Sequence, residues 1–421
     1  MELRGFKRTA AGLIPEAWVC STVRGSASRA RNAMVGGPFG SDLVSKDYVD
    51  DGVPVIRGQN MGAKTVSGSF VFVNQEKARS LEANMARPGD VVFTQRGTLG
   101  QVSLVPNGPF ERYLVSQSQM KVSLNREAVD PEFFYYLFSG PAQQEAIRLN
   151  TIQTGVPHIN LGILAAIPVP LPELTEQRAI ARGLSDADAL IESLEQLLAK
   201  KRHLKQGAMQ ELLTGKKRLP GHNRPWLAKR LGDLGSFSKG SGVSKGESKS
   251  GPLPCVRYGE IYTRHDAFIR EFHSRISSGV AATATRLQRG DILFAGSGET
   301  KEEIGKCVAF VDQFEAYAGG DIVVLRTVDA DPYFLGYYLN TAEINRQKAS
   351  RGQGDAVVHI GAAALAQIRG WFPPPEEQAA IAEVFLDIDT EIDTLEAKLT
   401  KARQIKQGMM QELLTGRIRL V

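Results

Sequence analysis

The sequence KQGAMQELLTG at residues 205–215 returns almost unchanged as KQGMMQELLTG at residues 406–416. The two copies differ at one position, Ala208 against Met409, and they are 201 residues apart. Self-similarity at a fixed offset indicates a structural unit that has been duplicated. The chain of 421 residues is therefore interpreted as one unit of about 200 residues that is used twice.

Shorter matches at or near the same offset extend through both halves. Two copies are too few for a solenoid, so a pseudo-two-fold arrangement is expected. The C-terminal segment of each half has stayed similar, whereas the globular part has diverged. This unevenness predicts that the two segments serve one kind of partner and that the globular parts serve different targets. The matches include Glu176-Gln177 with Glu377-Gln378, His158-Ile159 with His359-Ile360, Pro131 with Pro332, and residues 87–93 with 288–294.

Each conserved segment predicts a long helix. Residues 175–213 contain no proline, prolines precede each segment, and Gly215 and Gly416 stand where a glycine commonly ends a helix. A helix of about 39 residues would be about 58 Å long, so one small domain cannot bury its apolar stripe. We expect the two helices to pair, antiparallel. The stripe follows alternating steps of four and three, as in a coiled coil: Ile180, Leu184, Ala187, Ile191, Leu194 and Leu198, then Ile381, Phe385, Ile388, Ile392, Leu395, Leu399 and Ala402.

The near-identity of the two helix ends includes polar side chains that a simple seam would not constrain. A structural strut accounts for part of this similarity, and docking of a partner protein is the favoured explanation for the rest. The predicted docking residues are Gln177, Lys205, Gln206, Glu211, Gln378, Lys406, Gln407 and Glu412.

The globular parts are predicted to be mixed α and β. Short apolar runs at 53–56, 91–94, 102–105 and 120–124 are typical of buried strands. Asp130-Pro131 and Asp331-Pro332 each predict a helix start, with an N-cap followed by proline. The predicted fold class is α+β: two mixed α/β domains in tandem pseudo-two-fold repeat, joined by two long helices that form an antiparallel coiled coil. The predicted boundaries are 1–174 and 216–374 for the domains, and 175–215 and 375–421 for the helices.

Polar loops follow the predicted strands at matching places in both halves. Arg, Gln, Asn, Glu, Ser and Thr are the residue types that read base edges in DNA, although such residues populate surface loops in general. Thr154 and Asn160 belong to the same polar stretches. The candidate DNA-binding residues are Arg57, Gln59, Asn60, Gln95, Arg96, Thr98, Gln117, Gln119, His158, Arg257, Tyr258, Glu260, Ser297, Thr300, Lys301, Arg351, Gln353 and His359.

Composition and motifs favour a non-catalytic chain. The net charge of +5 is compatible with a polyanionic partner, and the three cysteines have no metal-binding spacing. No signal peptide or membrane span is indicated, so a cytoplasmic location is expected. Asp331-Pro332-Tyr333-Phe334 is similar to the Asp-Pro-Pro-Tyr motif of amino-methyltransferases, but its third residue is Tyr and helix capping explains it. No catalytic residue and no metal ligand are assigned.

The chain resembles the specificity subunit of type I restriction–modification systems over essentially its whole length. The resemblance departs from the family pattern at residues 298–300 and 370–372. The residues that support the resemblance are Lys7-Arg8-Thr9, Gly12-Leu13-Ile14-Pro15 with Trp18, Gly89-Asp90 and Gly290-Asp291, Gly97-Thr98, Ile167-Pro168-Val169-Pro170-Leu171-Pro172 followed by Glu176-Gln177, and the two Leu-Leu-Thr-Gly helix ends.

The resemblance implies two target-recognition domains, each reading one half of a bipartite, gapped site in double-stranded DNA. The helices would act as a ruler and as the docking surface for two modification (methyltransferase) subunits, which restriction (translocase and nuclease) subunits would join. S-adenosylmethionine, ATP and Mg²⁺ would bind those partners, and no cofactor is expected on this chain.

Three alternatives remain open. The chain could serve a type II-like system in which nuclease and methyltransferase are fused. It could act on DNA as an enzyme by itself, which predicts methylation or cleavage by the purified chain. It could also be a coiled-coil scaffold, which predicts no DNA affinity even with partners present.

Overall fold

A computed structural model describes residues 5–153, 155–354 and 357–420, which form two compact units. The first unit extends to Glu195 and resumes at Ala397, and the second extends from Gln196 to Glu396. Each long helix is therefore divided between the units, whereas the sequence-based boundaries give the helices segments of their own. Thr154, one of the polar residues noted above, lies outside the described residues.

The globular part of each unit has strands and short helices in a corresponding order. In the first unit these are β1 (Phe6–Thr9), β2 (Gly12–Pro15), β3 (Val19–Thr22), α1 (Val23–Ser26), β4 (Met34–Gly36), β5 (Tyr48–Val49), β6 (Val53–Ile56), β7 (Val71–Val73), α2 (Gln75–Ser80), β8 (Met85–Ala86), β9 (Val91–Thr94), β10 (Val102–Leu104), β11 (Tyr113–Val115), β12 (Gln119–Val122), α3 (Pro131–Ser139), α4 (Pro141–Leu149), α5 (Leu161–Ala166) and β13 (Pro168–Leu171). In the second unit they are β14 (Leu227–Arg230), β15 (Gly235–Lys239), β16 (Leu253–Val256), α7 (Tyr258–Thr263), β17 (Ser274–Ile276), α8 (Ser278–Ala281), β18 (Thr285–Arg286), β19 (Asp291–Ala295), β20 (Ser297–Gly298), β21 (Cys307–Ala309), β22 (Tyr317–Ala318), β23 (Ile322–Thr327), α9 (Pro332–Tyr338), α10 (Ala342–Ala349), β24 (Val358–His359), α11 (Ala362–Ala366) and β25 (Arg369–Phe372).

Two sheets form the body of each unit. The first unit has the strand orders β10-β9-β12-β4 and β5-β7-β6-β11-β8, and the second has β15-β23-β19-β21 and β17-β16-β22-β18. Neighbouring strands are antiparallel except for β6 with β11 and β16 with β22. The strands predicted at 53–56, 91–94 and 102–105 are confirmed, and the fourth is β12, which begins one residue before the predicted run.

The helix starts predicted at Asp130 and Asp331 are confirmed. The Asp130 carboxylate accepts hydrogen bonds from the backbone amides of Glu132 and Phe133, both at 3.0 Å. Asp331 accepts one from the amide of Phe334 at 2.8 Å, so capping accounts for the Asp-Pro-Tyr-Phe sequence there. In both units the bulky residues that follow are buried and anchor α3 and α9 on the sheet.

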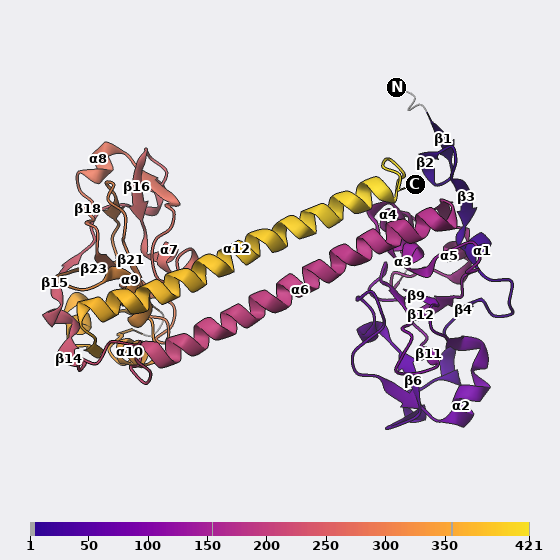
Figure 1. The fold of residues 1–421 in the computed structure, drawn as a ribbon, viewed down its shortest axis with the longest axis horizontal. Helices are drawn as coiled ribbons and strands as arrows, with labels where there is room; N and C mark the ends of the chain where they lie inside the picture. The colour runs from indigo at the N-terminus through magenta and orange to yellow at the C-terminus, as the bar shows by residue number, and fades with distance from the viewer. Residues whose placement is uncertain (1–4, 154, 355–356, 421) are drawn as a thin grey trace. The chain divides into compact units, whose positions relative to one another are not determined.

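The two long helices are α6 (Leu174–Leu212) and α12 (Pro375–Leu413), of 39 residues each, as predicted. In the first unit Lys406 pairs with Asp188, and Arg403 pairs with Glu195 at 2.6 Å, so residue numbers run in opposite directions along the pair. The second unit repeats this with α6 and α12 exchanged, and the antiparallel pairing is confirmed within each unit (Figure 1). Among the described residues, no helix is both long and apolar enough to cross a membrane.

Each globular core takes in the start of one long helix and the end of the other. Ile180 and Leu184 of α6 are completely buried in the first core, together with Leu413 near the end of α12. In the second core, Phe385 of α12 is buried together with Leu212 of α6. The first heptad positions therefore pack in the globular cores together with the end of the other long helix, which the heptad pattern alone did not reveal.

Candidate nucleic-acid interface

The parallel strand pair in each unit brings two polar loops to one edge of the sheet. β6 and β11 end side by side, and the amide of Ser116 donates to the carbonyl of Ile56 at 3.0 Å. In the second unit the amide of Gly319 donates to the carbonyl of Val256 at 2.9 Å. Loops 57–60 and 116–119, and likewise 257–260 and 319–321, are therefore neighbours.

A third loop and a late segment join this edge in the same way in both units. The amide of Gln95 donates to the carbonyl of Ser118 at 2.7 Å, and the carbonyl of Gln95 accepts from the amide of Ile159 at 3.0 Å. In the second unit the amide of Gly296 donates to the carbonyl of Asp321 at 2.7 Å, and the carbonyl of Gly296 accepts from the amide of Ile360 at 2.9 Å. The structure thus brings four separate stretches of each unit together, and predicted residues lie on all four in the first unit and on three in the second.

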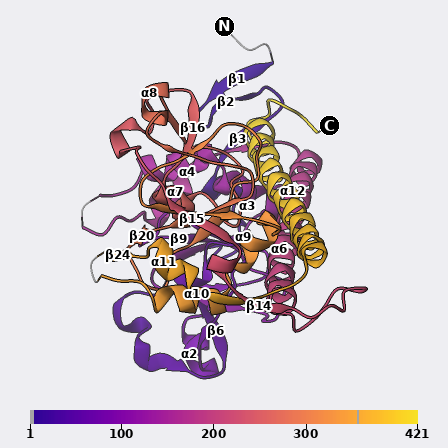
Figure 2. The same cartoon turned by 90° about the vertical axis from the view of Figure 1, so that its left-hand side faces the viewer.

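The histidines that are equivalent in the repeat lie at this edge in different surroundings. His158 forms a β-bridge with Arg96, and its Nδ1 lies 3.0 Å from the carbonyl oxygen of Val156. His359 pairs with Ser297 across β24 and β20, two strands that are labelled side by side in Figure 2. The Nδ1 of His359 lies 2.9 Å from the Ser297 hydroxyl. The backbone framework is the same in the two units, but the side chains it presents differ.

Three predicted DNA-binding residues are buried and need correction, Asn60 and Gln119 in the first unit and Ser297 in the second. Asn60 is 1% exposed: its carbonyl oxygen accepts from the amide of Arg57, and its amide donates to two backbone carbonyls of the same loop. Gln119 is 0% exposed and its Oε1 accepts from the Ser116 hydroxyl. Both side chains shape their loops from inside and are closed off from a base edge. The Ser297 side chain is buried against His359.

Three further candidates, Glu260, Gln117 and Gln59, form hydrogen bonds with other residues of their own unit. Glu260 accepts hydrogen bonds from the amide of Arg257 and the hydroxyl of Ser274. Gln117 donates to the carbonyls of residues 40 and 43, and Gln59 donates to that of residue 69.

The remaining candidates, together with Gln59 and Gln117, lie on the accessible part of the edge. Arg57, Gln95, His158, Arg257, Tyr258 and Arg351 are half-buried, and Asn160 caps α5. The exposed candidates are Gln59, Arg96, Thr98 and Gln117 in the first unit, and Thr300, Lys301, Gln353 and His359 in the second.

Comparison with known proteins identifies the family. A family model described as "Type I restriction modification DNA specificity domain" matches residues 44–200 and 223–404, one match in each repeat. The chain belongs to this family. A putative type I restriction enzyme specificity subunit of Methanocaldococcus jannaschii, MjaX, is 23% identical to it and covers 99% of this chain and 97% of its own length. The MjaVIII specificity subunit of the same organism is 24% identical over 73% of this chain and 75% of its own length.

Solved structures of type I restriction–modification S subunits share the fold. The S subunit from M. genitalium superposes with a TM-score of 0.57 at 16% identity, covering 94% of this chain and 96% of that one. A structure described under complex assembly and conformational transition of the type I system gives 0.55 at 18% identity, with 96% and 99% covered. The predicted architecture of tandem α/β domains with long paired helices is confirmed.

The repeated ends of the long helices carry several of the predicted docking residues, and the structure gives some of these another role. Gln177 and Gln378 are buried, and their Oε1 atoms accept from the amides of Asp130 and Asp331, which start α3 and α9. These two side chains tie the long helices to the globular parts and do not face a partner. Gln206, Glu211 and Gln407 are exposed, and Glu412 is half-buried.

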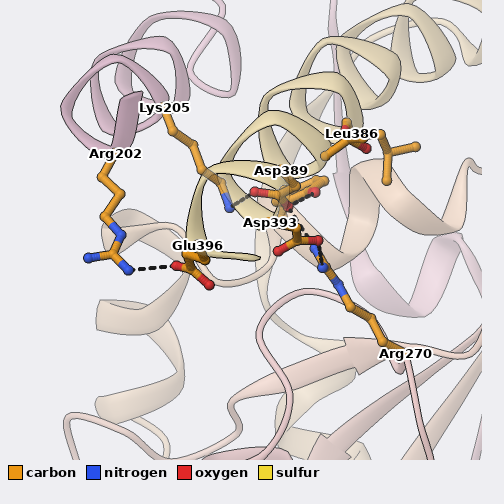
Figure 3. Close-up of polar contacts among 9 residues, drawn as sticks. Arg202, Lys205, Arg270, Leu386, Asp389, Asp393 and Glu396 are labelled. Carbon is orange, nitrogen blue, oxygen red and sulfur yellow. Dashed lines mark hydrogen bonds and ion pairs between the residues drawn. The ribbon is translucent and has the colours of Figure 1, made fainter. Parts of the chain in front are cut away.

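Lys205 and Lys406 belong to a partly buried cluster that occurs in both units. Asp389 pairs with Lys205 at 2.5 Å, and Arg270 also approaches it (Figure 3). Asp389 also accepts a hydrogen bond from the Tyr337 hydroxyl at 2.5 Å. In the first unit Asp188 takes the same two partners, Tyr136 and Lys406. Burial and the hydrogen bond to Asp389 raise the pKa of Tyr337. Tyr136, Asp188 and Lys406 are each 201 residues away from their equivalents Tyr337, Asp389 and Lys205. A residue-by-residue comparison of the two repeats could therefore have found both clusters.

His265 lies close to this cluster and predicts a pH dependence of stability. It is 5% exposed, and its Nε2 has no hydrogen-bond partner among the described residues. Burial, followed by the charges of His273 and Lys306, lowers the pKa of His265 to about 4, against about 6.5 in an unfolded chain. Between these values the unfolded state binds a proton that the folded state does not, so stability falls as pH falls from about 6.5 to about 4.

The test is urea unfolding followed at pH 7 and pH 4.5. His265→Gln should reduce the difference between the two unfolding midpoints, whereas His203→Gln, at an exposed position, should leave it unchanged. Equal pH dependence in the native chain and the His265 variant would contradict the assignment.

Proposed function

We propose that this chain is the DNA-recognition subunit of a type I restriction–modification complex, with each unit reading one half of a bipartite, gapped site. The observation that carries the proposal is the contrast between the two parts of the repeat. The loop edge keeps its backbone bonds but changes its side chains, while two ion pairs between the helices recur in both units. Different half-sites require different side chains on one framework.

The polar edge suits direct readout of DNA. Arg96 and Thr98 in one unit, and Thr300 and Lys301 in the other, are exposed. Arginine and lysine supply salt-dependent phosphate contacts and can bind guanine edges. The chain's net charge of +5 agrees with a polyanionic ligand.

The long helices are proposed to dock two modification subunits and to set the spacing between the half-sites. Beside the exposed polar residues, the helices expose Leu197 and Leu204 in the second unit, at 41% and 53%, and Ile405 in the first, at 49%. Exposed apolar side chains on a helix are suited to a protein partner. Restriction subunits would join this core, and S-adenosylmethionine, ATP and Mg²⁺ would bind the partners, so that this chain contributes no catalytic group.

The test is to purify the chain with its neighbouring methyltransferase subunit and map methylated adenines across a genome. A single gapped two-part motif is expected. Exchanging residues 18–170 for those of a relative should then change one half of the motif and leave the other half and the gap unchanged. Methylation without a motif, methylation by the chain alone, or no stable complex would each contradict the proposal. A partner in which nuclease and methyltransferase are fused would place the chain in a type II-like system instead.

A further inference from the structure

The loop between β9 and β10, and its counterpart between β19 and β21, return to the sheet through an equivalent glycine. Phe93 pairs with Val102 and Phe294 with Cys307, and Gly100 and Gly305 each lie two residues before the returning strand. Eight residues separate the first pair and twelve separate the second, so the second loop is four residues longer. Both glycines nevertheless have positive φ, +85° and +72°.

One side chain holds this glycine to the neighbouring helix in each unit. Gln144 of α4 donates from Nε2 to the carbonyls of Gly100 and Phe138, at 2.8 and 2.6 Å. Lys348 of α10 donates from Nζ to the carbonyls of Gly305 and Leu339, at 2.7 and 2.9 Å. Phe138 and Leu339 are equivalent in the repeat, so the same two carbonyls are bridged in both units.

The two bridging residues are not themselves equivalent. The 201-residue offset places Asn345 opposite Gln144, and Ile147 opposite Lys348. Positions three apart lie on the same face of a helix, so the units reach the same carbonyls from neighbouring positions with different chemistry. Ile147 fills the position of Lys348 with an apolar side chain, so packing alone does not require an ammonium group there.

The space around the glycines agrees with this role. A Cβ atom at Gly100 would lie 2.3 Å from Oε1 of Gln144, and one at Gly305 would lie 3.1 Å from Cδ of Lys348. Lys348 is 0% exposed, and burial lowers its pKa. A buried ammonium group is unfavourable unless hydrogen bonds compensate it, and the two carbonyls supply those bonds.

We propose that Gln144 and Lys348 are positioning residues that fix the paths of loops 95–100 and 296–305, and through them the half-site selectivity of each unit. The proposal rests on the proposed function, because these loops carry the exposed Arg96 and Thr98, and Thr300 and Lys301. Base-specific hydrogen bonds require side chains held to within about 0.5 Å of their binding position. A loop that is no longer bonded to the helix would not hold its side chains that closely.

The first measurement needs no DNA. In the complex with the methyltransferase, Lys348→Met should increase amide hydrogen exchange in residues 297–306 about tenfold, as expected for one lost hydrogen bond, and leave residues 95–101 unchanged. Gln144→Leu should do the reverse. Arg346→Met, at an exposed position on the same helix as Lys348, is the matched control and should change neither loop.

The second measurement is the methylated motif. Lys348→Met should relax base selection in one half-site and Gln144→Leu in the other, with the gap and the yield of complex unchanged. The double variant Asn345→Gln/Lys348→Ile installs the bridge of the first unit in the second. It should restore both the protection of the loop amides from hydrogen exchange and the selection of bases in the half-site.

The outcomes separate this proposal from the proposed function. Three results would overturn it. These are unchanged hydrogen exchange in both loops, relaxed base selection in both half-sites together, and hydrogen exchange in the double variant as fast as in Lys348→Met. If Lys348→Met fails to assemble, Gln144→Leu decides by the same criteria. Faster loop exchange in a complex that methylates no defined motif would instead show that the proposed function is wrong.

Discussion

Replacing Glu377 with alanine is expected to destabilise the second unit by about 1–3 kcal/mol, the usual loss when partly buried donors lose their acceptor. The Glu377 side chain is 1% exposed and accepts two hydrogen bonds from Arg218, at 2.5 and 2.6 Å. It also accepts one from the indole of Trp226 at 3.2 Å. Alanine would leave a guanidinium and an indole N–H without their acceptor where α12 begins.

The neighbouring residue provides a matched control. Glu376 pairs with Arg224 at 2.7 Å, but its side chain is 53% exposed. Exposed pairs contribute about 0–1 kcal/mol, so Glu376→Ala should change stability by less than that. Urea unfolding of both variants gives the comparison, and similar losses would contradict the central role assigned to Glu377. Glu176, with Arg419 and Trp18, forms the equivalent site in the first unit.

This buried site explains much of the sequence that defines the repeat. Gly215 follows α6 with φ +69°, and a Cβ there would lie 3.4 Å from the ring of Trp226. The turn brings Arg218 back onto Glu377. Gly416 and Arg419 repeat the arrangement around Trp18 and Glu176. The identity of the helix ends, interpreted from sequence as a sign of partner docking, is therefore partly a consequence of packing within the chain.

Local patterns in the sequence were sufficient for the helices and most of the predicted strands. The heptad spacing and the flanking prolines and glycines depend on neighbouring residues, so they placed the starts of α6 and α12 to within about one residue, whereas α12 ends at Leu413, before the predicted boundary at residue 421. The same holds for the caps at Asp130 and Asp331.

The orientation of polar side chains could not be predicted in this way. Asn60 and Gln119 have the chemistry of adenine-reading residues, but they turn inward because loop backbone groups and Ser116 need their oxygens and amides. Lys205 contacts Asp389, 184 residues further along the chain. Such pairings depend on tertiary structure. A single sequence does not reveal them unless its two repeats are compared residue by residue.

Inserting seven residues into each long helix, between residues 195 and 196 and between 396 and 397, is expected to lengthen the DNA gap by about three base pairs. Seven residues preserve the heptad register and add about 10 Å of helix, against about 3.4 Å of DNA per base pair. The insertion points leave the ion pairs within each unit intact, including Arg403 with Glu195 and Arg202 with Glu396. The two half-sites should not change, because the loops that we propose read them are untouched.

Mapping methylated adenines with the extended chain measures this directly: methylation of the original motif should be lost, and a motif with the same halves and a longer gap should appear. The same insertion in α6 alone is the control, because it shifts one helix against the other and should abolish assembly rather than produce a new motif. A changed half-site, or an unchanged gap in the doubly extended chain, would mean that the helices do not set the spacing and that the distance between the half-sites is fixed by the partner subunits instead.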